Sequence, residues 1–176
     1  MFFSNTALIM EIKNENQPIL RNISFEEDNN FFSLFINKDG PNTVGEIHWS
    51  NSFKYGKLNI VHFIQLNTKV ILFTSSTQNT IPFKKIINHI LPNSEVQMFR
   101  LPLPVPNRKI NLKEIQKLDI DECFGLTMIL NVINETILSK VYTNGVLTFS
   151  TLNNIQYDDA IYILNLIIKV IEEFNE

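Results

Sequence analysis

The amino-acid sequence predicts an α+β protein with an antiparallel sheet, built from two related halves. Three observations lead to this prediction. The chain ends in a β-hairpin followed by a long apolar helix, the same order of elements occurs earlier, and apolar side chains alternate in the strands of both copies. Two such units can join edge to edge into one continuous sheet, with helices on one side and a broad open face on the other. We place the halves at residues 1–92 and 93–176.

A strong hairpin signal lies near the C-terminus, where Asn144 and Gly145 accept the positive φ angles of a tight turn. Beyond the turn, large apolar and small hydroxylated side chains alternate, which is the period of a strand with one buried face. The apolar members are Leu147 and Phe149, and the hydroxylated members are Thr148 and Ser150. Asn153 or Asn154 can then cap a helix at about 155–174 that carries an apolar stripe. We expect this helix to cover the apolar members and to leave the hydroxylated face bare.

Three more elements complete the second half in this interpretation. The segments GLTMILNV at 125–132 and VQMFRLPL at 96–103 each have the composition of a strand. Between them, the segment at 105–118 is predicted to contain a short helix with Asn111 as its cap. The expected order is therefore strand, helix, three strands and a final helix.

The first half repeats this order of a strand followed by a helix. The segment VILFTSS at 70–76 aligns with VLTFSTL at 146–152 at a constant offset of 76 residues. Ile71 and Phe73 match the apolar members of the second hairpin, so we expect both beneath a helix at about 81–91. Leu72 and Thr74 match the hydroxylated members and are expected on the open face. The segment TALIMEIK at 6–13 can serve as a first strand. The segment ISFEEDNNFFSLF at 23–35 can serve as the intervening helix, with Ser24 and Glu27 forming a capping box.

Composition limits the classes of function. The net charge of −3 provides no overall positive field that would draw the chain to nucleic acid or to an anionic membrane, so a nucleic-acid contact needs a local patch. No segment is long and apolar enough to span a bilayer. A single cysteine, Cys123, allows no disulfide within the chain, which fits a reducing intracellular compartment.

The sequence contains no Gly-rich phosphate loop, no metal-binding Cys/His spacing and no nucleophile elbow. We therefore expect no enzyme activity, no metal, no cofactor and no small-molecule substrate. Cys123 could be a catalytic thiol, but no motif places a base beside it, and a small half-buried thiol is the simpler interpretation. The acidic runs at 26–28 and 119–122 are interpreted as solvated caps and loops. The Pro-rich segment at 101–106 could be a polyproline ligand, but it more simply ends an edge strand.

The order of elements and several short segments resemble the TATA-box-binding protein family. VQMF at 96–99 stands where the family has its first strand, and NRKINLKEIQ at 107–116 stands where it has its first helix. FGL at 124–126 stands where the family has Phe-Pro-Gly-Leu. VYTNGVLTFST at 141–151 stands where it has an aromatic residue, a Ser-Gly turn and Val-Leu-Thr-Gly. The second half carries this resemblance, which implies a saddle: one curved antiparallel sheet with helices on its convex side.

In that family, a pair of phenylalanines in each repeat wedges between base steps in the minor groove of DNA. The resemblance therefore implies three groups of DNA-contacting positions, which are wedge, hydroxylated and basic residues. The wedge positions are Phe124 and Tyr142 in the second repeat and Val44 and Leu66 in the first; the hydroxylated positions are Ser150, Thr148 and Thr74; the basic positions are Lys69, Lys140 and Arg100.

The sequence also departs from the family pattern. The asparagines that the family places near the centre of the saddle correspond to Met98 and Leu8, which cannot make the same hydrogen bonds. Several phosphate-binding Arg and Lys positions correspond to Ile129, Ser50 and Val146. Since phosphate neutralisation provides most non-specific affinity, the three basic positions that remain predict weak DNA binding.

Taken with these departures, the resemblance implies a transcription initiation factor that binds AT-rich double-stranded promoter DNA through the minor groove. Binding would be weak and would need other proteins of the transcription apparatus as partners. The alternative is a protein-interaction module that keeps the fold and has lost DNA binding, with a polypeptide partner on its open face. Both interpretations place the protein inside the cell, in the nucleus or, if the chain comes from a large DNA virus, at the site of viral transcription.

Overall fold

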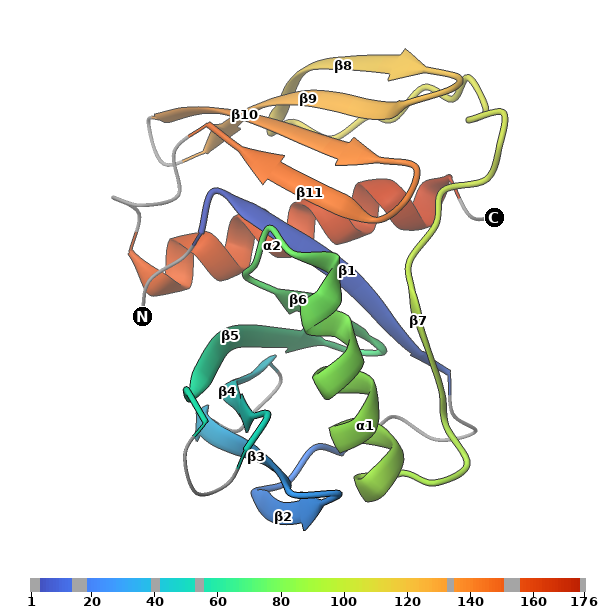
Figure 1. Ribbon diagram of the computed structural model, residues 1–176. Coiled ribbons are helices and arrows are strands. Elements are labelled where there is room, and N and C mark those ends of the chain that lie inside the picture. Colours follow the sequence, from blue (N-terminus) through green and yellow to red (C-terminus); the bar gives the residue numbers. More distant parts are fainter. Residues whose placement is uncertain are drawn as a thin grey trace. The chain divides into compact units, whose positions relative to one another are not determined.

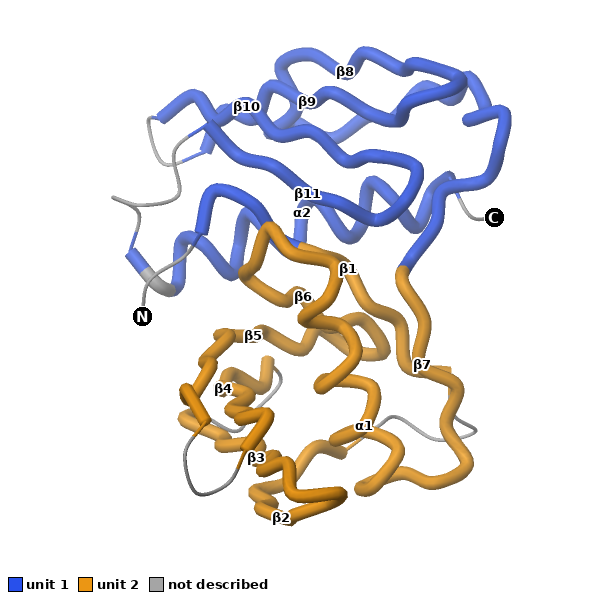
Figure 2. The backbone as a smooth tube through the Cα atoms, viewed as in Figure 1, with its two compact units in different colours: residues 1–7, 99–176 blue, residues 8–98 orange. Residues whose placement is uncertain are grey.

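The computed structural model describes residues 4–13, 19–38, 42–52, 56–132, 135–150 and 156–174. In this part of the chain, two α-helices accompany strands that pair antiparallel, so the predicted α+β class with an antiparallel sheet is confirmed (Figure 1). The contacts within the chain define two compact units (Figure 2). Unit 1 comprises residues 1–7 and 99–176, and unit 2 comprises residues 8–98. Neither α-helix in the described part has the length and apolar character that crossing a membrane requires.

Unit 2 contains an antiparallel sheet in which hydrogen-bonded neighbours follow the order β2-β3-β4-β5-β6-β1. These strands are β1 (Thr6–Lys13), β2 (Ile23–Glu27), β3 (Asn30–Lys38), β4 (Asn42–Ser50), β5 (Asn59–Leu66) and β6 (Lys69–Leu72). A further strand, β7 (Glu95–Met98), also pairs with β1, in a register that places Met98 opposite Met10. The helix α1 (Thr80–Ile90) follows β6 in the chain, as the sequence predicted.

The helix α1 covers the face of this sheet that carries Phe25 and Phe32, which are cross-strand partners. The rings of Phe25 and His89 stack with their centroids 4.1 Å apart. The Nζ atom of Lys85 lies 5.3 Å from the centroid of the Phe32 ring. Alternation along the strands then places neighbouring side chains of β3, β4 and β5 on one face or the other. One face lies against α1, and the other is directed away from it.

Unit 1 contains the strand order β11-β10-β9-β8, which is an antiparallel meander. Its elements are β8 (Ile115–Asp121), β9 (Gly125–Val132), β10 (Glu135–Tyr142), β11 (Val146–Phe149) and α2 (Tyr157–Glu173). The N-terminal end of the chain belongs to this unit, because the N–H of Phe149 donates to the carbonyl of Asn5 over 2.9 Å. Leu147 and Phe149 are buried, as predicted, and apolar side chains of α2, β9 and β10 are buried as well. The predicted caps Asn153 and Asn154 lie outside the described residues, and α2 begins after Gln156.

The predictions of an intervening helix in each half are both wrong, because both segments contain strands. The first segment, 23–35, forms a hairpin of β2 and β3 instead. Asp28 and Asn29 form its turn with φ angles of 51° and 63°, which these two residue types tolerate better than most. Ser24 and Glu27, the expected capping box, therefore both belong to the strand β2. In the second segment, Asn111 caps no helix, and residues 115–121 form the strand β8.

The strand expected at 96–103 is shorter than predicted, because β7 ends at Met98. Pro102, Pro104 and Pro106 follow closely, and a proline has no N–H to contribute to a sheet. The peptide bond between Leu103 and Pro104 is cis. The Pro-rich segment thus ends the strand, as the simpler interpretation held.

The expected orientation of β6 is wrong, although both of its predicted core residues are buried. Ile71 pairs with Ile64 and Leu72 pairs with Phe63. Because Phe63 also pairs with Gly45 on the face that meets α1, the register places Leu72 on the helix side and Ile71 on the opposite side. The turn before β6 is one residue shorter than the turn before β11. A one-residue difference moves every side chain of a strand to the other face, so the constant sequence offset does not preserve the faces.

Candidate functional site

The face of the unit 1 sheet that lies opposite its buried residues forms a surface of largely uncharged side chains. The strand register aligns Thr127 of β9, Lys140 of β10 and Thr148 of β11 in one row. We call this surface the open face of unit 1. Its members are Thr127, Ile129, Asn131, Thr136, Leu138, Lys140, Tyr142, Val146, Thr148 and Ser150, all of them exposed or partly exposed. Small hydroxylated and aliphatic side chains predominate on these three strands, where Lys140 is the one charged member. The register of β8 adds Lys117, Asp119 and Asp121 to the same face.

Two exposed aromatic residues lie at one end of the unit 1 sheet. Phe124 is 69% exposed and Tyr142 is 37% exposed. Gly125 follows Phe124 in the chain and pairs with Tyr142 across the sheet. Gly125 has a φ angle of 131°, and a Cβ atom there would lie 2.0 Å from the carbonyl oxygen of Val141. Only glycine permits this close approach of the backbone to β10.

Backbone hydrogen bonds hold Phe124 in place although its ring is exposed. Oδ1 of Asp121 accepts from the N–H of Cys123 over 2.9 Å and from the N–H of Phe124 over 3.0 Å. The carbonyl of Phe124 accepts from the N–H of Thr143 over 3.0 Å. An exposed aromatic ring on a well-fixed backbone is suited to insertion into a partner, because little backbone entropy is lost on binding.

The hydroxylated positions of unit 1 differ in their availability. Thr148 is partly exposed beside Lys140, its cross-strand partner. Ser150 is exposed, but its Oγ accepts a hydrogen bond from the N–H of Leu138 over 3.0 Å. The Ser150 hydroxyl therefore also helps to extend the pairing of β10 and β11, and its O–H can still donate to a ligand.

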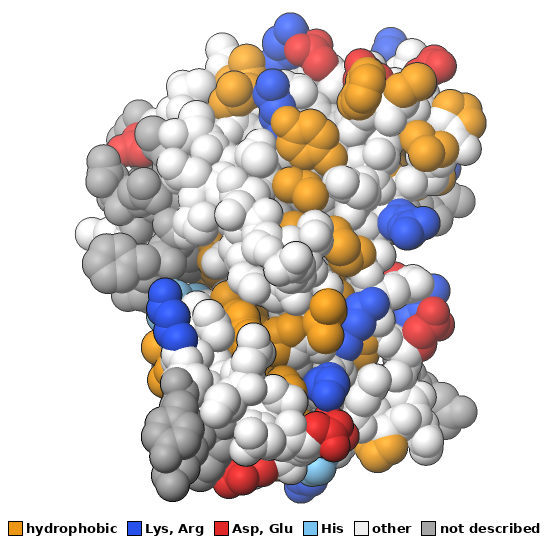
Figure 3. All heavy atoms as spheres, viewed as in Figure 1, with side chains coloured by type: hydrophobic (Ala, Val, Ile, Leu, Met, Phe, Trp, Pro, Cys, Tyr) orange, Lys and Arg blue, Asp and Glu red, His pale blue; other side chains and the backbone are white. Residues whose placement is uncertain are grey.

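Few cations accompany the open face of unit 1. Lys140 is exposed and has no ion-pair partner among the described residues. Arg100 is exposed beside the β10–β11 turn, since the N–H of the next residue, Leu101, donates to the carbonyl of Thr143 over 3.1 Å. Lys117 on β8 is neutralised by Asp119, whose Oδ2 lies 2.6 Å from its Nζ. In Figure 3, Lys and Arg side chains on the face in view are scattered among uncharged and acidic ones and do not form one large basic patch.

The positions assigned to DNA contact in the first half lie in unit 2 and are buried. Val44 and Leu66 are each 2% exposed, and Thr74 is 9% exposed. Thr74 Oγ1 accepts from the side-chain amide of Asn79 over 2.7 Å. Lys69 is 6% exposed, and its Nζ lies 3.8 Å from Oε1 of Glu11. Unit 2 thus offers neither the expected wedges nor the expected free cation, and the structure brings together only the positions in unit 1.

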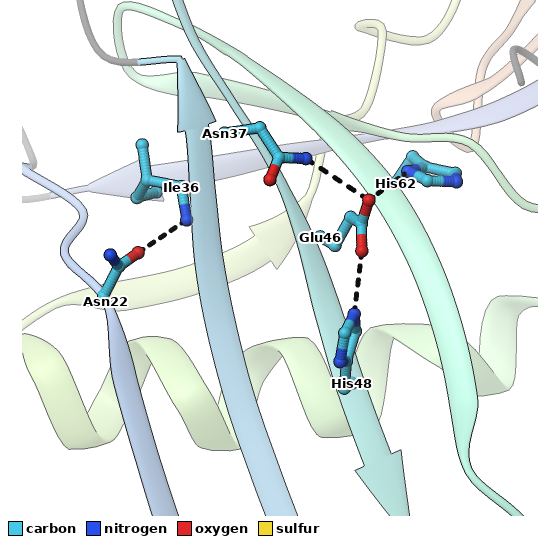
Figure 4. Close-up of polar contacts among 6 residues, drawn as sticks. All are labelled: Asn22, Ile36, Asn37, Glu46, His48 and His62. Atoms are coloured by element: carbon cyan, nitrogen blue, oxygen red, sulfur yellow. Dashed lines mark hydrogen bonds and ion pairs between the residues drawn. The ribbon is translucent and has the colours of Figure 1, made fainter. Parts of the chain in front are cut away.

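Sequence reasoning missed a polar cluster on β3, β4 and β5, on the side of the unit 2 sheet directed away from α1 (Figure 4). Glu46 is its centre. Oε2 of Glu46 lies 2.9 Å from Nε2 of His48, and Oε1 accepts from the side-chain amide of Asn37 over 3.3 Å. Nδ1 of His62 lies 3.4 Å from Oε1, within ion-pair distance but outside hydrogen-bonding geometry. The hydrogen bond from His48 is the main cause of a lowered pKa of the Glu46 carboxyl, which burial partly opposes.

The spacing Glu46-x-His48 in the sequence could have predicted that these two side chains lie together, because residues i and i+2 of a strand share one face. Ser33 is the cross-strand partner of His48 and is fully buried. Its Oγ makes no hydrogen bond, so Ser33 and His48 do not form a nucleophile–base pair. No group of three or more His, Cys, Asp or Glu side chains in the described part is arranged to hold a metal ion. Cys123 is exposed and carries a free thiol, so it is not the half-buried thiol that we expected.

Comparison of the chain with protein-family models, with curated proteins and with solved structures finds no match.

Proposed function

We propose that this chain is a diverged relative of the TATA-box-binding proteins that binds AT-rich double-stranded DNA in the minor groove through the open face of unit 1. The observation that carries the proposal is the exposure of Phe124 and Tyr142 at one end of the unit 1 sheet. The order of elements supports it, since the five-stranded meander β2–β6 of unit 2 and the four-stranded meander β8–β11 of unit 1 are each followed by a helix in the chain.

The chemistry of the open face suits a minor groove more than a major groove. The minor groove of A·T sequences presents only acceptors and sugar walls, so small hydroxyls and aliphatic groups can follow it closely. Thr127, Thr148 and Ser150 provide hydroxyls, and Ile129 and Val146 provide apolar contact. The rings of Phe124 and Tyr142 would unstack a base step at the end of the bound site and kink the duplex. This step costs a few kcal/mol and is easiest at flexible steps such as TA.

The binding would be one-sided and weak. Unit 2 cannot supply a second wedge while Val44 and Leu66 are buried, and Lys69 is paired with Glu11. Lys140 and Arg100 then remain to neutralise phosphates, each contributing about 0.9 to the log–log salt slope. We therefore propose a slope of about −2 and a requirement for a basic protein partner from the transcription apparatus to reach tight binding.

The test is a titration of a fluorescently labelled AT-rich duplex at two salt concentrations, together with a bending assay. Phe124→Ala and Tyr142→Ala should each weaken binding and reduce the bend. Phe35→Ala is a matched control, because Phe35 is an aromatic residue of unit 2 that is 41% exposed, and it should leave both readings unchanged. Equal binding and bending by wild type and by both unit 1 variants would refute the proposal.

A second candidate function is a protein-interaction module with the same open face. The acidic residues beside Phe124 favour it, since Asp121 and the exposed Glu122 repel phosphates. This candidate predicts no binding to AT-rich duplex near 50 mM salt by any variant. It predicts that Phe124→Ala and Tyr142→Ala release a protein partner in a pull-down from native extract, whereas Phe35→Ala does not.

A further inference from the structure

We propose that a groove formed by the Pro-rich segment of unit 1 docks an acidic peptide with aromatic side chains, which a partner protein supplies. The groove has a volume of about 580 Å³ and belongs to the connection from β7 to β8, beside the C-terminal end of α2 (Figure 1). We call it the proline groove. None of its lining residues is a member of the open face, so the inference goes beyond the function proposed above.

The sequence of this segment alternates with a period of two. Residues 100–108 read RLPLPVPNR, so every even-numbered residue is an arginine or a proline and no odd-numbered residue is. Alternate side chains of an extended chain point to the same side. The odd-numbered residues Leu101 and Val105 are buried, at 3% and 1% exposure. The even-numbered residues all line the groove, and they are Arg100, Pro102, Pro104, Pro106 and Arg108.

The groove is preformed, because the backbone beneath it is held at two points. The N–H of Leu101 donates to the carbonyl of Thr143 over 3.1 Å, and the N–H of Val105 donates to the carbonyl of Glu122 over 3.1 Å. Each proline ring also restricts its own φ angle. A ligand that binds along this segment therefore has little backbone to order, which lowers the entropic cost of docking.

The charge of the groove points to an anionic ligand. Its lining includes two arginines and no acidic side chain. Arg100 is exposed and makes no ion pair within the described part of the chain. Nη1 of Arg108 donates to the carbonyl of Glu173 at the end of α2, which positions the guanidinium and leaves its other N–H groups for a ligand. Guanidinium groups bind carboxylates in a bidentate geometry, so two carboxylates of one ligand would complement the two ends of the segment.

The apolar surface between the two arginines favours a peptide over DNA. Proline rings pack well against aromatic side chains, which is the basis of proline recognition. The buried residues Leu101 and Phe174 add further apolar lining. A phosphate backbone could pair with the arginines but would leave this apolar surface unfilled. An aromatic side chain with carboxylates on both sides fills it and satisfies both charges.

The test measures fluorescence anisotropy of a labelled peptide that has two central phenylalanines and a pair of glutamates at each end. The wild-type chain should bind this peptide, and the affinity should fall as salt is added, because salt screens the attraction between carboxylate and guanidinium. A peptide with glutamines in place of the glutamates, and one with serines in place of the phenylalanines, should each bind about tenfold more weakly. No binding by the wild type, or equal binding of either altered peptide, overturns the proposal.

The chain contains three arginines, and Arg21, which is exposed in unit 2, provides the matched control. Arg100→Gln and Arg108→Gln should each weaken peptide binding about tenfold, whereas Arg21→Gln should leave it unchanged. Pro102→Ser should also weaken binding, because it removes an apolar ring from the groove. Thermal unfolding of every variant accompanies these readings, since Arg108 also contacts the end of α2. Arg100 makes no such contact, so equal binding by wild type and folded Arg100→Gln overturns the proposal.

Further variants separate this proposal from the function proposed above. Phe124→Ala and Tyr142→Ala should bind the peptide as the wild type does, because neither residue lines the groove. If the chain binds no duplex but binds the peptide through Arg108, the function proposed for the open face fails and the proline groove stands. If Arg108→Gln weakens duplex binding as much as peptide binding, the ligand is DNA and the proposal is overturned. A wild-type dimer that Arg108→Gln dissociates would overturn it too, because the occupant would be a second copy of the chain.

Discussion

Unit 1 and unit 2 each contain an antiparallel meander followed by a helix, but they present different surfaces. In unit 1, the face opposite the core carries mostly uncharged side chains, and the exposed residues Phe124 and Tyr142 lie at one end of the sheet. In unit 2, the matching positions Val44 and Leu66 are buried, and the side of the sheet away from α1 carries the Glu46 cluster instead. A similar strand order therefore does not give the two units similar surfaces.

The comparison also shows which features both units need. Gly45 of β4 and Gly125 of β9 each lie close against a neighbouring strand, and a side chain at either one would collide with a carbonyl oxygen. A Cβ atom at Gly45 would lie 2.1 Å from the carbonyl oxygen of Phe35 and 2.8 Å from the ring of Phe63. The close approach of neighbouring strands at these two glycines is common to both units, while the surfaces built on them are not.

The largest expected effect tests the assignment of faces in unit 1. Phe149→Ala should reduce the free energy of unfolding by about 3–5 kcal/mol, because it removes a buried aromatic ring from the core. Thr148→Ala, one residue away on the open face, should change it by less than about 0.5 kcal/mol. Urea denaturation of both variants provides the measurement. Equal losses would mean that the two faces of β11 are assigned the wrong way round.

The next effect tests the shared glycines. Gly125→Ala should destabilise the protein by about 3 kcal/mol, because it adds both a positive-φ strain and a collision with a backbone oxygen. Gly45→Ala should cost about 1–3 kcal/mol, since it adds the collision without the positive φ angle. Thermal and urea unfolding should rank the two variants in this order. The reverse ranking would contradict the account given for Gly125.

A smaller effect concerns acid stability and applies to unit 2 alone. The pKa of Glu46 is lowered in the folded protein from its ordinary value of 4.5, chiefly by the hydrogen bond from His48. The carboxylate therefore stabilises the fold above pH 4.5, and this stabilisation is lost as the pH falls through the lowered pKa. The unfolding midpoint of Glu46→Gln should change less between pH 6 and pH 3 than that of wild type. Parallel pH profiles would show that Glu46 does not contribute.

The smallest expected effect compares two lysines in DNA binding. Lys140→Gln should make the log–log salt slope shallower by about 0.9, because it removes one phosphate contact. Lys69→Gln should leave the slope unchanged, since Lys69 is buried and paired with Glu11. Titrations of the two folded variants at several salt concentrations distinguish them. An equal change in both would mean that the Lys69 side chain reaches DNA.

The sequence predicted those elements whose signals are local. Asn144 and Gly145 marked the β10–β11 turn, and the helical spacing of apolar residues marked both helices. The segment at 23–35 was predicted to be a helix because Ser24 and Glu27 have the spacing of a capping box. Pairing of β3 with β4 instead stabilises an extended conformation. The face of β6 and the Glu46–His62 contact depend on cross-strand register. No local pattern records that register, so neither could be read from the sequence.

The hydrogen bond between Phe149 and Asn5 has a consequence for the order of synthesis. A ribosome makes unit 2 whole before most of unit 1 has been translated, yet Asn5, which pairs with β11, is made before any of unit 2. Asn5 can therefore form this hydrogen bond only after all of unit 2 and most of unit 1 have been made. The late, long-range closure of unit 1 raises its contact order, so unit 1 is expected to fold after unit 2 and more slowly. A fragment that starts at residue 99 would leave the N–H of Phe149 without its partner.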